Sequence, residues 1–453
     1  MYQKVYEKIY FPFFERFLKH RRIASIYEGS FETQWLNLSK IQNRQVNSLK
    51  KLLCLAQTHS AYYKDLFKRN SFDPHELSSL NDLSQIDILN KDIIRQKFDS
   101  LISSPFKNNL WRKSTGGSTG QPLHFGYTKE SYEWRVAMSK RGYAWAGARP
   151  GTKQAYIWGV SLGETTTKQR LKESLHHFID RQKFYNCFEF GEQEMAQCLA
   201  SLNKWQPQNL VGYTNPLYEF ALYVDRNGGP LFKPQSILCA AEKVYPYQRE
   251  VLQKVFGAPV FNTYGSREFM LIASECEKHE GLHISMENLI VEVVDDDGRP
   301  TRPGEVGKIL VTDLHNYGMP FIRYEIGDMA RVSDHQCSCG RGLMLLDDIV
   351  GRSLDVIRLP EGKTLPGEFF PHLMKDFPEV YRFQVIQDRI DQLIVKLVPH
   401  GELGAGTRSA IEQIIASAVG PDMVVAYEIV SEIPLTISGK HRVTISNLSQ
   451  VVA

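Results

Sequence analysis

A run of seven glycine and hydroxyl residues could bind phosphate. Residues 114–120 read Ser-Thr-Gly-Gly-Ser-Thr-Gly and contain no apolar side chain. Glycines let backbone N–H groups converge on one anion, and the hydroxyls add further donors. The pattern is neither G-x-x-x-x-G-K-[ST] nor G-x-G-x-x-G, which excludes the two commonest nucleotide motifs. A polar linker is the alternative, but a strand-like run follows at residues 122–128, so we expect a tight loop between strands.

An aromatic residue and a carboxylate lie close together in a second segment, residues 260–269. Its apolar start predicts a strand, and its end delivers Tyr264, Gly265 and Glu268 to a loop. Open α/β sheets bind ligands at the carboxyl ends of their strands, so this loop is a candidate site. A glutamate beside phosphates is suited to hold Mg²⁺.

Three charged residues in the last third of the chain could complete a nucleotide site. Asp328 follows a glycine turn and could accept hydrogen bonds from ribose hydroxyls. Arg352 lies at a predicted domain boundary, and Lys440 lies in a polar loop that can place a mobile cation. Each of these motifs alone is modest evidence.

Cysteine and histidine gather in two further segments. Residues 275–283 supply Cys276, His279 and His283, and residues 336–342 supply Cys337 and Cys339. A Cys-x-Cys-Gly turn paired with a distant cysteine and histidine suits tetrahedral Zn²⁺, and four protein ligands indicate a structural ion. Free thiols in a reducing compartment are the alternative.

Length, charge and cysteine content limit the number of domains and the class of protein. At 453 residues the chain is long enough for two to four domains. A net charge of +3 gives no argument for nucleic acid, and no apolar run is long enough to span a bilayer. Seven cysteines in so long a chain do not make a disulfide scaffold, so we expect a cytoplasmic protein. Four of them sit among apolar residues and are expected to be buried thiols: Cys54, Cys187, Cys198 and Cys239.

The N-terminal segment is basic and aromatic. Residues 1–60 carry ten Lys or Arg against four Asp or Glu. An aromatic and apolar stripe, interrupted at Pro12, comprises Tyr6, Ile9, Tyr10, Phe13, Phe14 and Phe17. With Lys19, Arg21 and Arg22 it could touch a membrane surface peripherally. The alternative is that the stripe docks on its own domain.

The periodicity of the chain predicts an α/β fold. Residues 1–100 read as mainly helical, and strands alternate with helices from about 110 to 350, which is typical of a mostly parallel sheet. After about 285 the pattern becomes β-rich, with a turn at Asp297-Gly298. We therefore predict a large N-terminal domain over residues 1–350 and a small α+β domain over residues 351–453.

Five motifs, in this order, resemble those of adenylate-forming enzymes. The branch is that of the phenylacetate–CoA ligases and their CapK-like relatives of capsule polysaccharide biosynthesis. Residues 114–122 (STGGSTGQP) are similar to the phosphate loop, and residues 263–268 (TYGSRE) to the Tyr-Gly-x-x-Glu motif. Residues 323–328 (RYEIGD), 351–355 (GRSLD) and 434–440 (PLTISGK) are similar to the Arg-Tyr-x-x-Gly-Asp, hinge and catalytic-lysine motifs. The resemblance runs from about residue 60 to residue 447.

The resemblance implies a role for each matching residue. The ATP phosphates would be held by Ser114, Thr115, Gly116, Gly117, Ser118, Thr119 and Gly120. The rest of the nucleotide would be bound by Glu242, Lys243, Tyr264, Gly265, Ser266, Asp328 and Arg352, with Tyr264 at the adenine and Asp328 and Arg352 at the ribose. The acyl pocket would be lined by Gly212, Tyr213 and Tyr245. Glu268 would ligate Mg²⁺, Lys440 would bridge the substrate carboxylate and the α-phosphate, and His283 rather than His279 would complete the zinc site.

The sequence departs from the family pattern at two places, in the charge of the phosphate loop and in the hinge motif. The loop commonly has lysine where this chain has Gln121, and Arg267 replaces the motif threonine, so Arg267 could restore the missing positive charge. Leu354 occupies the usual place of the hinge aspartate and Asp355 follows, so the pivot is assigned only to residues 353–355.

The implied reaction uses ATP, Mg²⁺ and a small carboxylic acid. An acyl adenylate forms with release of pyrophosphate, and a CoA thiol then accepts the acyl group. In this family the small C-terminal domain rotates between the two steps. Transfer to an amine or a sugar hydroxyl remains an alternative, as does a non-catalytic binding protein of the same fold. Relatives often form homodimers.

Overall fold

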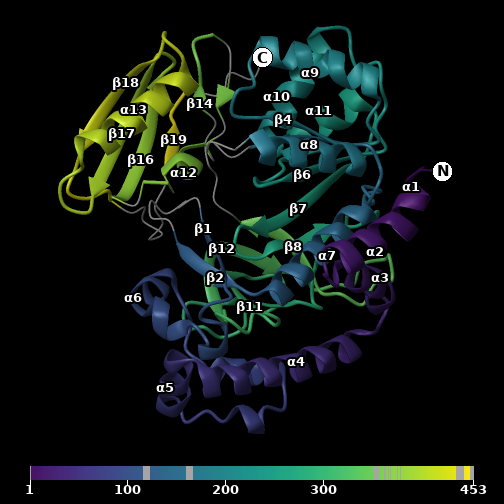
Figure 1. The fold of residues 1–453 in the computed structure, drawn as a ribbon, viewed down its shortest axis with the longest axis vertical. Helices are drawn as coiled ribbons and strands as arrows, with labels where there is room; N and C mark the ends of the chain where they lie inside the picture. The colour runs from purple at the N-terminus through teal and green to yellow at the C-terminus, as the bar shows by residue number, and fades with distance from the viewer. Residues whose placement is uncertain are drawn as a thin grey trace. The chain divides into compact units, whose positions relative to one another are not determined.

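The computed structural model describes residues 2–115, 123–159, 167–350, 357–361, 364–365, 367, 369–374, 376–377, 379–434 and 443–448. The chain divides into two compact units (Figure 1). Unit 1 comprises residues 1–113, 124–152 and 261–352, and unit 2 comprises residues 114–123, 153–260 and 353–453. Each unit is therefore assembled from segments that are distant in the sequence.

Helices dominate the first part of unit 1, as the sequence predicts. They are α1 (Tyr2–Val5), α2 (Phe11–Phe13), α3 (Ile23–Thr33), α4 (Leu38–His59), α5 (Ala61–Arg69), α6 (Lys91–Leu101) and α7 (Lys129–Trp145). Side chains cap several of their first turns: the Lys40 N–H donates to Oδ1 of Asn37 at 3.0 Å, and the Ser131 N–H donates to Oγ1 of Thr128 at 3.2 Å. Such caps satisfy backbone donors that a helix start leaves unpaired.

The helical segment continues through Pro12, the residue at which the sequence interrupts the aromatic stripe. Two wide turns flank the short α2, at Tyr6–Tyr10 and Phe14–Leu18. In these turns each N–H reaches the carbonyl five residues back, as the Lys19 N–H does to the Phe14 carbonyl at 3.0 Å. Proline lacks an N–H and crowds the carbonyl four residues before it, and widening the helix accommodates both constraints.

Seven described strands of unit 1 form an antiparallel sheet in the order β7-β8-β9-β13-β12-β11-β10. They are β7 (Val260–Ser266), β8 (Met270–Glu275), β9 (Leu282–Ile284), β10 (Leu289–Val294), β11 (Val306–Asp313), β12 (Tyr324–Val332) and β13 (Leu345–Val350). The predicted turn at Asp297-Gly298 joins β10 to β11, and Gly298 has a φ of 77°. Antiparallel pairing begins at β7 and β8, earlier than the predicted start of the β-rich region near residue 285.

A short two-stranded sheet, β1 (Trp111–Ser114) with β2 (His124–Tyr127), flanks the phosphate-loop motif. The Thr115 N–H donates to the Leu123 carbonyl at 2.9 Å, and the Leu123 N–H donates to Oγ1 of Thr115 at 3.0 Å. The predicted strand-to-strand placement of the loop is therefore confirmed.

The first part of unit 2 is a parallel α/β layer, as the alternating pattern predicts. Its strands β3 (Gln154–Trp158), β4 (Gln182–Asn186), β5 (Asn209–Tyr213) and β6 (Ser236–Ala240) pair in the order β6-β5-β3-β4. The helices between and after them are α8 (Thr167–Asp180), α9 (Glu192–Trp205), α10 (Thr214–Arg226) and α11 (Pro246–Phe256). Every residue of β5 and β6 is buried, which is typical of central parallel strands.

The C-terminal part of unit 2 is an α+β module. Its sheet has the order β18-β17-β16-β19, from β16 (Val380–Arg389), β17 (Gln392–Pro399), β18 (Val424–Ile429) and β19 (Thr444–Ser446). The other elements are β14 (Ile357–Arg358), β15 (Thr364–Leu365), α12 (Phe369–Met374) and α13 (Ala405–Val419). The module contains an antiparallel strand pair, a helix and a further strand, as expected of an α+β domain.

One cysteine prediction is wrong. Cys187, Cys198 and Cys239 are buried thiols, but Cys54 is only partly buried. The buried stripe of α4 includes Leu49, Leu52, Leu53 and Ala56, and Cys54 lies beside that stripe rather than on it. Its Sγ atom lies 3.9 Å from Nδ1 of His75.

Candidate nucleotide and metal sites

A hydrogen bond joins Tyr264 to Asp328 across unit 1. The Tyr264 hydroxyl donates to Oδ2 of Asp328 at 3.0 Å, although 64 residues separate them. They lie on β7 and β12, four places apart in the strand order. In a flat sheet this would be a separation of about 19 Å, because neighbouring strands lie about 4.8 Å apart. The sheet must therefore coil strongly, and the coiling brings the predicted adenine and ribose residues together.

The Glu268 carboxylate is buried beside the same motif. Glu268 as a whole residue is only 5% exposed. Its Oε1 accepts a hydrogen bond from the Tyr324 hydroxyl at 3.0 Å. The Tyr324 ring is itself buried, and its centroid lies 4.9 Å from that of Phe321 and 5.9 Å from that of Phe269. The aromatic packing fixes the phenol, and the phenol in turn orients the carboxylate.

Gly265 is required by the backbone between these two residues. A Cβ atom added there would lie 2.2 Å from the Met270 carbonyl oxygen, which is backbone and cannot move aside. The pairing of β7 with β8 shifts register between Tyr264 and Gly265. This bulge turns the chain so that Tyr264 and Glu268 both reach β12.

Three cationic side chains lie near the residue that precedes the phosphate-loop motif: those of Lys113, Arg135 and Arg267. Burial lowers the pKa of the Lys113 ammonium, and the nearby guanidinium groups of Arg267 and Arg135 lower it further. The Lys113 Nζ atom also lies 5.3 Å from the centroid of the Tyr127 ring. Like charges held close together favour an anion between them. Arg267 is exposed, and its guanidinium is close enough to Lys113 to affect the pKa of that ammonium.

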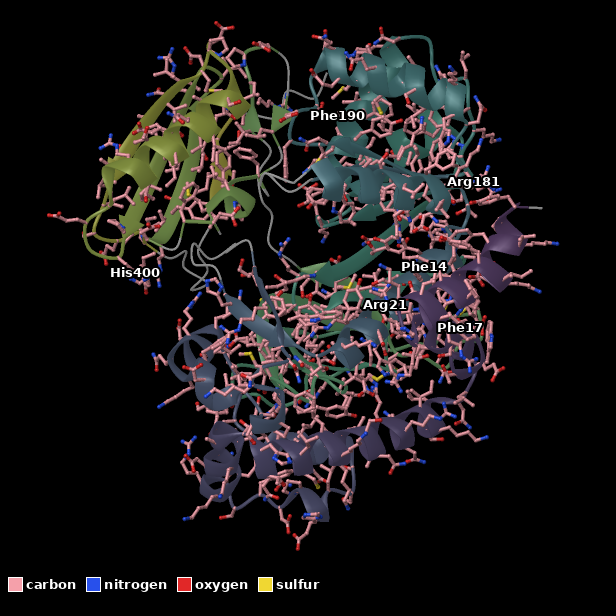
Figure 2. The ribbon with its side chains drawn as sticks, in the orientation of Figure 1. Phe14, Phe17, Arg21, Arg181, Phe190 and His400 are labelled. Atoms are coloured by element: carbon pink, nitrogen blue, oxygen red, sulfur yellow. The ribbon has the colours of Figure 1, made fainter. Side chains whose placement is uncertain are left out.

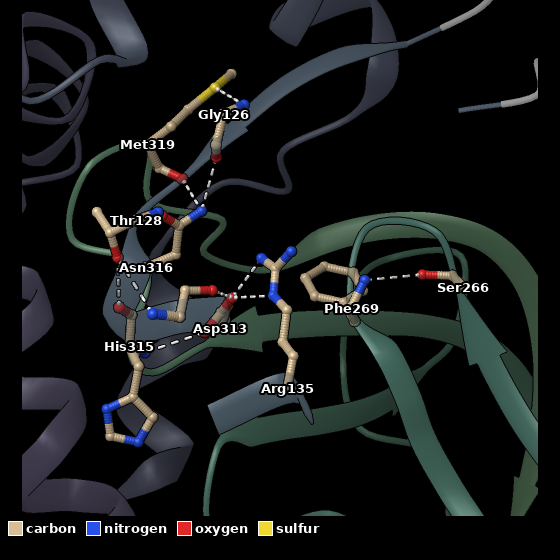
Figure 3. A network of polar contacts seen from close by, with 10 residues as sticks. Gly126, Thr128, Arg135, Ser266, Phe269, Asp313, His315, Asn316 and Met319 are labelled. Carbon is tan, nitrogen blue, oxygen red and sulfur yellow. Dashed lines mark hydrogen bonds and ion pairs between the residues drawn. The ribbon is translucent and has the colours of Figure 1, made fainter. Parts of the chain in front are cut away.

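A buried polar network holds these elements in register (Figure 3). Asp313, at the end of β11, accepts hydrogen bonds from Arg135 at 2.7 Å and from the Ser131 hydroxyl at 2.8 Å, both on α7. The Arg135 guanidinium lies over the rings of Tyr127 and Phe269, at 4.9 and 5.9 Å from their centroids. It therefore contacts the strand after the phosphate loop and the residue after Glu268 together.

The arginine of the Arg-Tyr-x-x-Gly-Asp motif has a structural role at the start of β12. Arg323 is buried, with its Nη1 donating to the Ile86 carbonyl at 2.8 Å and its Nη2 to the Gly298 carbonyl at 2.7 Å. Its Nε donates to the Glu292 carboxylate at 3.1 Å. These contacts fix the start of β12, which carries Tyr324 and Asp328.

In unit 2, the predicted acyl-pocket residues Gly212 and Tyr213 end strand β5. A Cβ atom on Gly212 would lie 2.7 Å from the Ile157 carbonyl oxygen of the adjacent strand, so only glycine fits. The Tyr213 ring is buried, with its centroid 4.8 Å from that of Trp158 and 6.4 Å from that of Phe188. The end of β5 thus carries an aromatic cluster.

Glu242 follows β6 with a buried carboxylate. Its Oε2 accepts the Asn215 N–H at 2.8 Å, and its Oε1 has no hydrogen-bond partner among the described residues. Burial raises the pKa of this carboxyl from 4.5 to about 7, although the Asn215 hydrogen bonds oppose the shift. The group is therefore partly protonated near neutral pH.

The neighbouring residues Lys243 and Tyr245 lie at the surface of unit 2. The Lys243 Nζ is 5.9 Å from the centroid of the Tyr245 ring, and that ring stacks on Tyr247 with centroids 5.9 Å apart. Tyr245 is exposed, unlike the buried Tyr213.

Four potential zinc ligands meet in unit 1: Cys276, His283, Cys337 and Cys339, with their ligand atoms all within 4.8 Å of one another. The Cys276 and Cys337 sulfurs are 3.6 Å apart, and the Cys339 sulfur is 3.4 Å from Nε2 of His283. A tetrahedral zinc ion would hold two thiolates about 3.8 Å apart and a thiolate and an imidazole nitrogen about 3.6 Å apart. The donor set and its spacing fit Zn²⁺.

His279 lies outside this cluster. Its Nδ1 is 3.1 Å from the Glu275 carboxylate, and its ring lies 4.6 Å from that of Phe261. Of the two histidines, the structure groups His283 with the three cysteines.

Several predicted residues lie outside the described part of the chain. These are Gly116, Gly117, Ser118, Thr119, Gly120, Gln121, Arg352, Leu354, Asp355 and Lys440. Their roles stay predictions.

The sequence interpretation missed four residues of unit 1: Lys113, Arg135, Asp313 and Tyr324. Lys113 directly precedes the phosphate-loop motif, and Tyr324 lies inside the Arg-Tyr-x-x-Gly-Asp motif, so their positions were a usable signal. Arg135 and Asp313 are far from any motif in sequence, and only the folded chain joins them.

Comparisons with known proteins extend over nearly the whole chain. Residues 357–447 match the family model described as the CapK C-terminal domain. Protein CapK of Staphylococcus aureus is 24% identical over 95% of this chain and 94% of its own length. The phenylacetate-coenzyme A ligase of Thermus thermophilus is 27% identical over 80% of this chain and 81% of its own.

A solved structure of 2-hydroxyisobutyryl-CoA ligase, in complex with 2-HIB-AMP and CoA, has a TM-score of 0.63 to this chain. The two are 18% identical, and the match covers 92% of each. The fold class is thereby confirmed: it is the α/β fold of the adenylate-forming ligases, with a large sheet and a small C-terminal domain. Among proteins of that fold, the chain is similar to CapK and to the phenylacetate-coenzyme A ligases.

Proposed function

We propose that this protein uses ATP to activate a carboxylic acid as an acyl adenylate and then transfers the acyl group to CoA. The observation that carries the proposal is the meeting of two distant motifs in unit 1. Tyr264 contacts Asp328 and Glu268 contacts Tyr324, each at 3.0 Å. A purely structural role would not need a buried carboxylate, a second carboxylate and a cluster of cations at one sheet end.

In the first step, a carboxylate oxygen of the acid attacks the α-phosphorus of ATP. A carboxylate–phosphate anhydride bond forms, the bond to the β-phosphate oxygen breaks, and pyrophosphate leaves. Lys113 and Arg267 are suited to bind the phosphates. Their positive charges lie close together and repel one another, and a bound anion would relieve that repulsion. Asp328 is suited to accept ribose hydroxyls, with Tyr264 fixing its orientation.

Glu268 is suited to hold Mg²⁺. The Tyr324 hydroxyl engages Oε1, which leaves Oε2 as the ligand atom for a hard cation. When bound, the ion would neutralise phosphate charge as pyrophosphate leaves. Lys440 is proposed to bridge the acid and the α-phosphate.

Separate assays of the two half-reactions test the role of Lys440. Lys440→Ala should abolish adenylation while sparing thioester formation from a synthetic acyl adenylate. Equal loss of both steps would contradict the role. In the second step, the CoA sulfur attacks the acyl carbon, the thiol proton is released and AMP leaves.

The proposal has two versions, which differ in the molecule that accepts the acyl group. CoA is favoured by the phenylacetate-coenzyme A ligase relatives, whereas the match to CapK over nearly the whole chain keeps an amine or sugar acceptor as the second candidate. Product analysis with and without CoA separates them. A product that forms at full rate without CoA would rule out the thioester.

An acyl-hydroxamate screen over aromatic, fatty and amino acids should identify the acid. Hydroxylamine traps the adenylate, so a positive well reports the first step whatever the natural acceptor. Failure to bind ATP would favour a non-catalytic protein of the same fold. The boundary near residue 351, the cytoplasmic address and a homodimer stay predictions.

We further propose that Cys276, His283, Cys337 and Cys339 bind a structural zinc ion, which would clip the segment after β8 to the segment before β13. Elemental analysis of the purified chain should find about one zinc per chain. Cys337→Ser should lose the metal, whereas Cys54→Ser, which alters a thiol outside the cluster, should keep it. Equal zinc content in both variants would contradict the site.

A further inference from the structure

The inner face of the N-terminal helical segment, residues 2–18, packs on unit 1. Tyr6, Phe11 and Glu15 are buried. The Phe11 ring meets the Tyr27 ring edge-on at 6.0 Å between centroids. Tyr6 is the buried member of the stripe, so part of the stripe docks on its own unit, as one of the two sequence interpretations expected.

The outer face of the same segment is apolar and exposed. Ile9 is 65%, Phe13 50% and Phe17 57% exposed, and Figure 2 places Phe17 on the outer side of the segment. Isolated exposed apolar residues are ordinary, but a continuous row of them marks an interaction surface.

The wide turns around α2 straighten this row. In an α-helix of 3.6 residues per turn, residues four apart drift around the axis by about 40° per step. The turns at Tyr6–Tyr10 and Phe14–Leu18 have more residues per turn, so the drift reverses there. Val5, Ile9, Phe13 and Phe17 consequently form one straight row, which we name the outer row.

The charges on this surface have one sign. Nine described residues of the segment are exposed, and six of them are apolar or aromatic while three are cations: Tyr2, Lys4, Val5, Lys8, Ile9, Phe13, Arg16, Phe17 and Leu18. The acids are engaged inward. Glu7 accepts the Tyr27 hydroxyl at 2.8 Å, and buried Glu15 pairs with Arg21 at 2.7 Å.

We propose that the outer row, with Lys4, Lys8 and Arg16, is a docking surface for an anionic membrane, on which the protein lies without crossing. An aromatic and apolar row flanked only by cations is complementary to the boundary between acyl chains and negative headgroups. None of the described helices is long and apolar enough to cross a membrane.

The cations that flank the row differ from those the sequence suggested. Arg21 is bound to Glu15, and Arg22 donates to Glu130 at 2.9 Å, so both are engaged within unit 1. A second copy of this chain fits the surface less well, because a symmetric pair would bring two sets of cations together without an exposed acid on the segment.

Vesicle flotation of the full chain tests the proposal, with vesicles of phosphatidylcholine alone and of phosphatidylcholine with phosphatidylglycerol at about 7:3. We expect binding to the mixed vesicles that weakens with salt. The triple variant Ile9→Ser, Phe13→Ser, Phe17→Ser should lower the partition coefficient on the order of 100-fold. The triple variant Lys4→Gln, Lys8→Gln, Arg16→Gln should remove the preference for phosphatidylglycerol.

Leu231→Ser is the matched control, because Leu231 is 78% exposed and lies in unit 2. It should bind like the wild type. Phe13→Trp gives a direct readout of contact: brominated lipid should quench its emission more than that of the wild type, whose six tryptophans set the background. Absence of wild-type binding to mixed vesicles, or equal binding by the serine triple variant, would overturn the proposal. So would a wild-type dimer that the serine variant dissociates without any vesicle binding.

Discussion

Glu268 and Glu242 follow the ends of two strands, β7 and β6, and both carboxylates are buried, yet their surroundings differ. Glu268 accepts a phenol hydrogen bond from Tyr324, and its chain neighbour Arg267 belongs to a cation cluster. Glu242 accepts a backbone N–H, and burial raises its pKa to about 7. From these partners we expect the Glu268 carboxylate to bind a cation and the Glu242 carboxyl to be only partly ionised near neutral pH.

The largest expected effect is on catalysis by Glu268→Gln. Removing the anionic ligand should lower kcat for hydroxamate formation on the order of 100-fold, because metal-assisted charge stabilisation is lost. Glu242→Gln should lower it no more than about fivefold, since the native group is already partly protonated. Steady-state assays with the acid found by screening would measure both. Similar losses in the two variants would erase the distinction.

Asp328→Asn should come next, with an effect on nucleotide binding. Asp328 loses its charge, and its hydrogen bonds to ribose would weaken, so the KM for ATP should rise about 10- to 50-fold with a smaller change in kcat. Tyr264→Phe removes only the orienting hydroxyl and should raise KM about threefold to fivefold. A larger effect from Tyr264→Phe than from Asp328→Asn would contradict the assigned roles.

Tyr324→Phe sharpens the account of Glu268. The variant keeps the ring that packs on Phe321 and removes one donor to the carboxylate. Loss of one hydrogen bond to a charged group is worth about 1.5 kcal/mol, so the Mg²⁺ concentration for half-maximal rate should shift by up to about tenfold. A Mg²⁺ titration of the variant measures this shift. An unchanged titration would show that the phenol does not position the ligand.

The smallest expected effect concerns stability and pH. A folded-state pKa of about 7, raised from 4.5, means that folded Glu242 keeps a proton that the unfolded chain loses. Its contribution to stability is therefore full below about pH 4.5 and is lost as pH rises through 7. Glu242→Gln should match the wild type near pH 5 and melt about 1 to 3 °C higher at pH 8. A difference that does not grow with pH would contradict the raised pKa.

Local patterns predicted much of this fold. The strand-like run at residues 122–128 predicted β2, and helical periodicity predicted the helices of residues 1–100, because these signals act over neighbouring residues. The antiparallel pairing of β7 with β8 was not predicted, because pairing direction depends on contacts between distant segments. The spacing of the Cys and His residues predicted the cluster of Cys276, His283, Cys337 and Cys339, because ligand type and turn geometry depend on neighbouring residues.

The side-chain partners of the candidate site were not predictable in the same way. Tyr264 meets Asp328 only because the sheet coils, and Arg135 meets Asp313 across more than one hundred residues. The N-terminal stripe was read as one surface, whereas packing divides it into a buried side with Tyr6 and an exposed side with Phe13. Such outcomes depend on tertiary packing rather than on propensity.

Reversible adenylation produces acid-dependent exchange of labelled pyrophosphate into ATP, so this exchange is the decisive assay for the proposed activity. We expect exchange by the wild-type chain with at least one acid of a broad library, and its loss in Glu268→Gln under conditions in which that variant remains folded. Silence of the folded wild type across the whole library, or full exchange by Glu268→Gln, would contradict it.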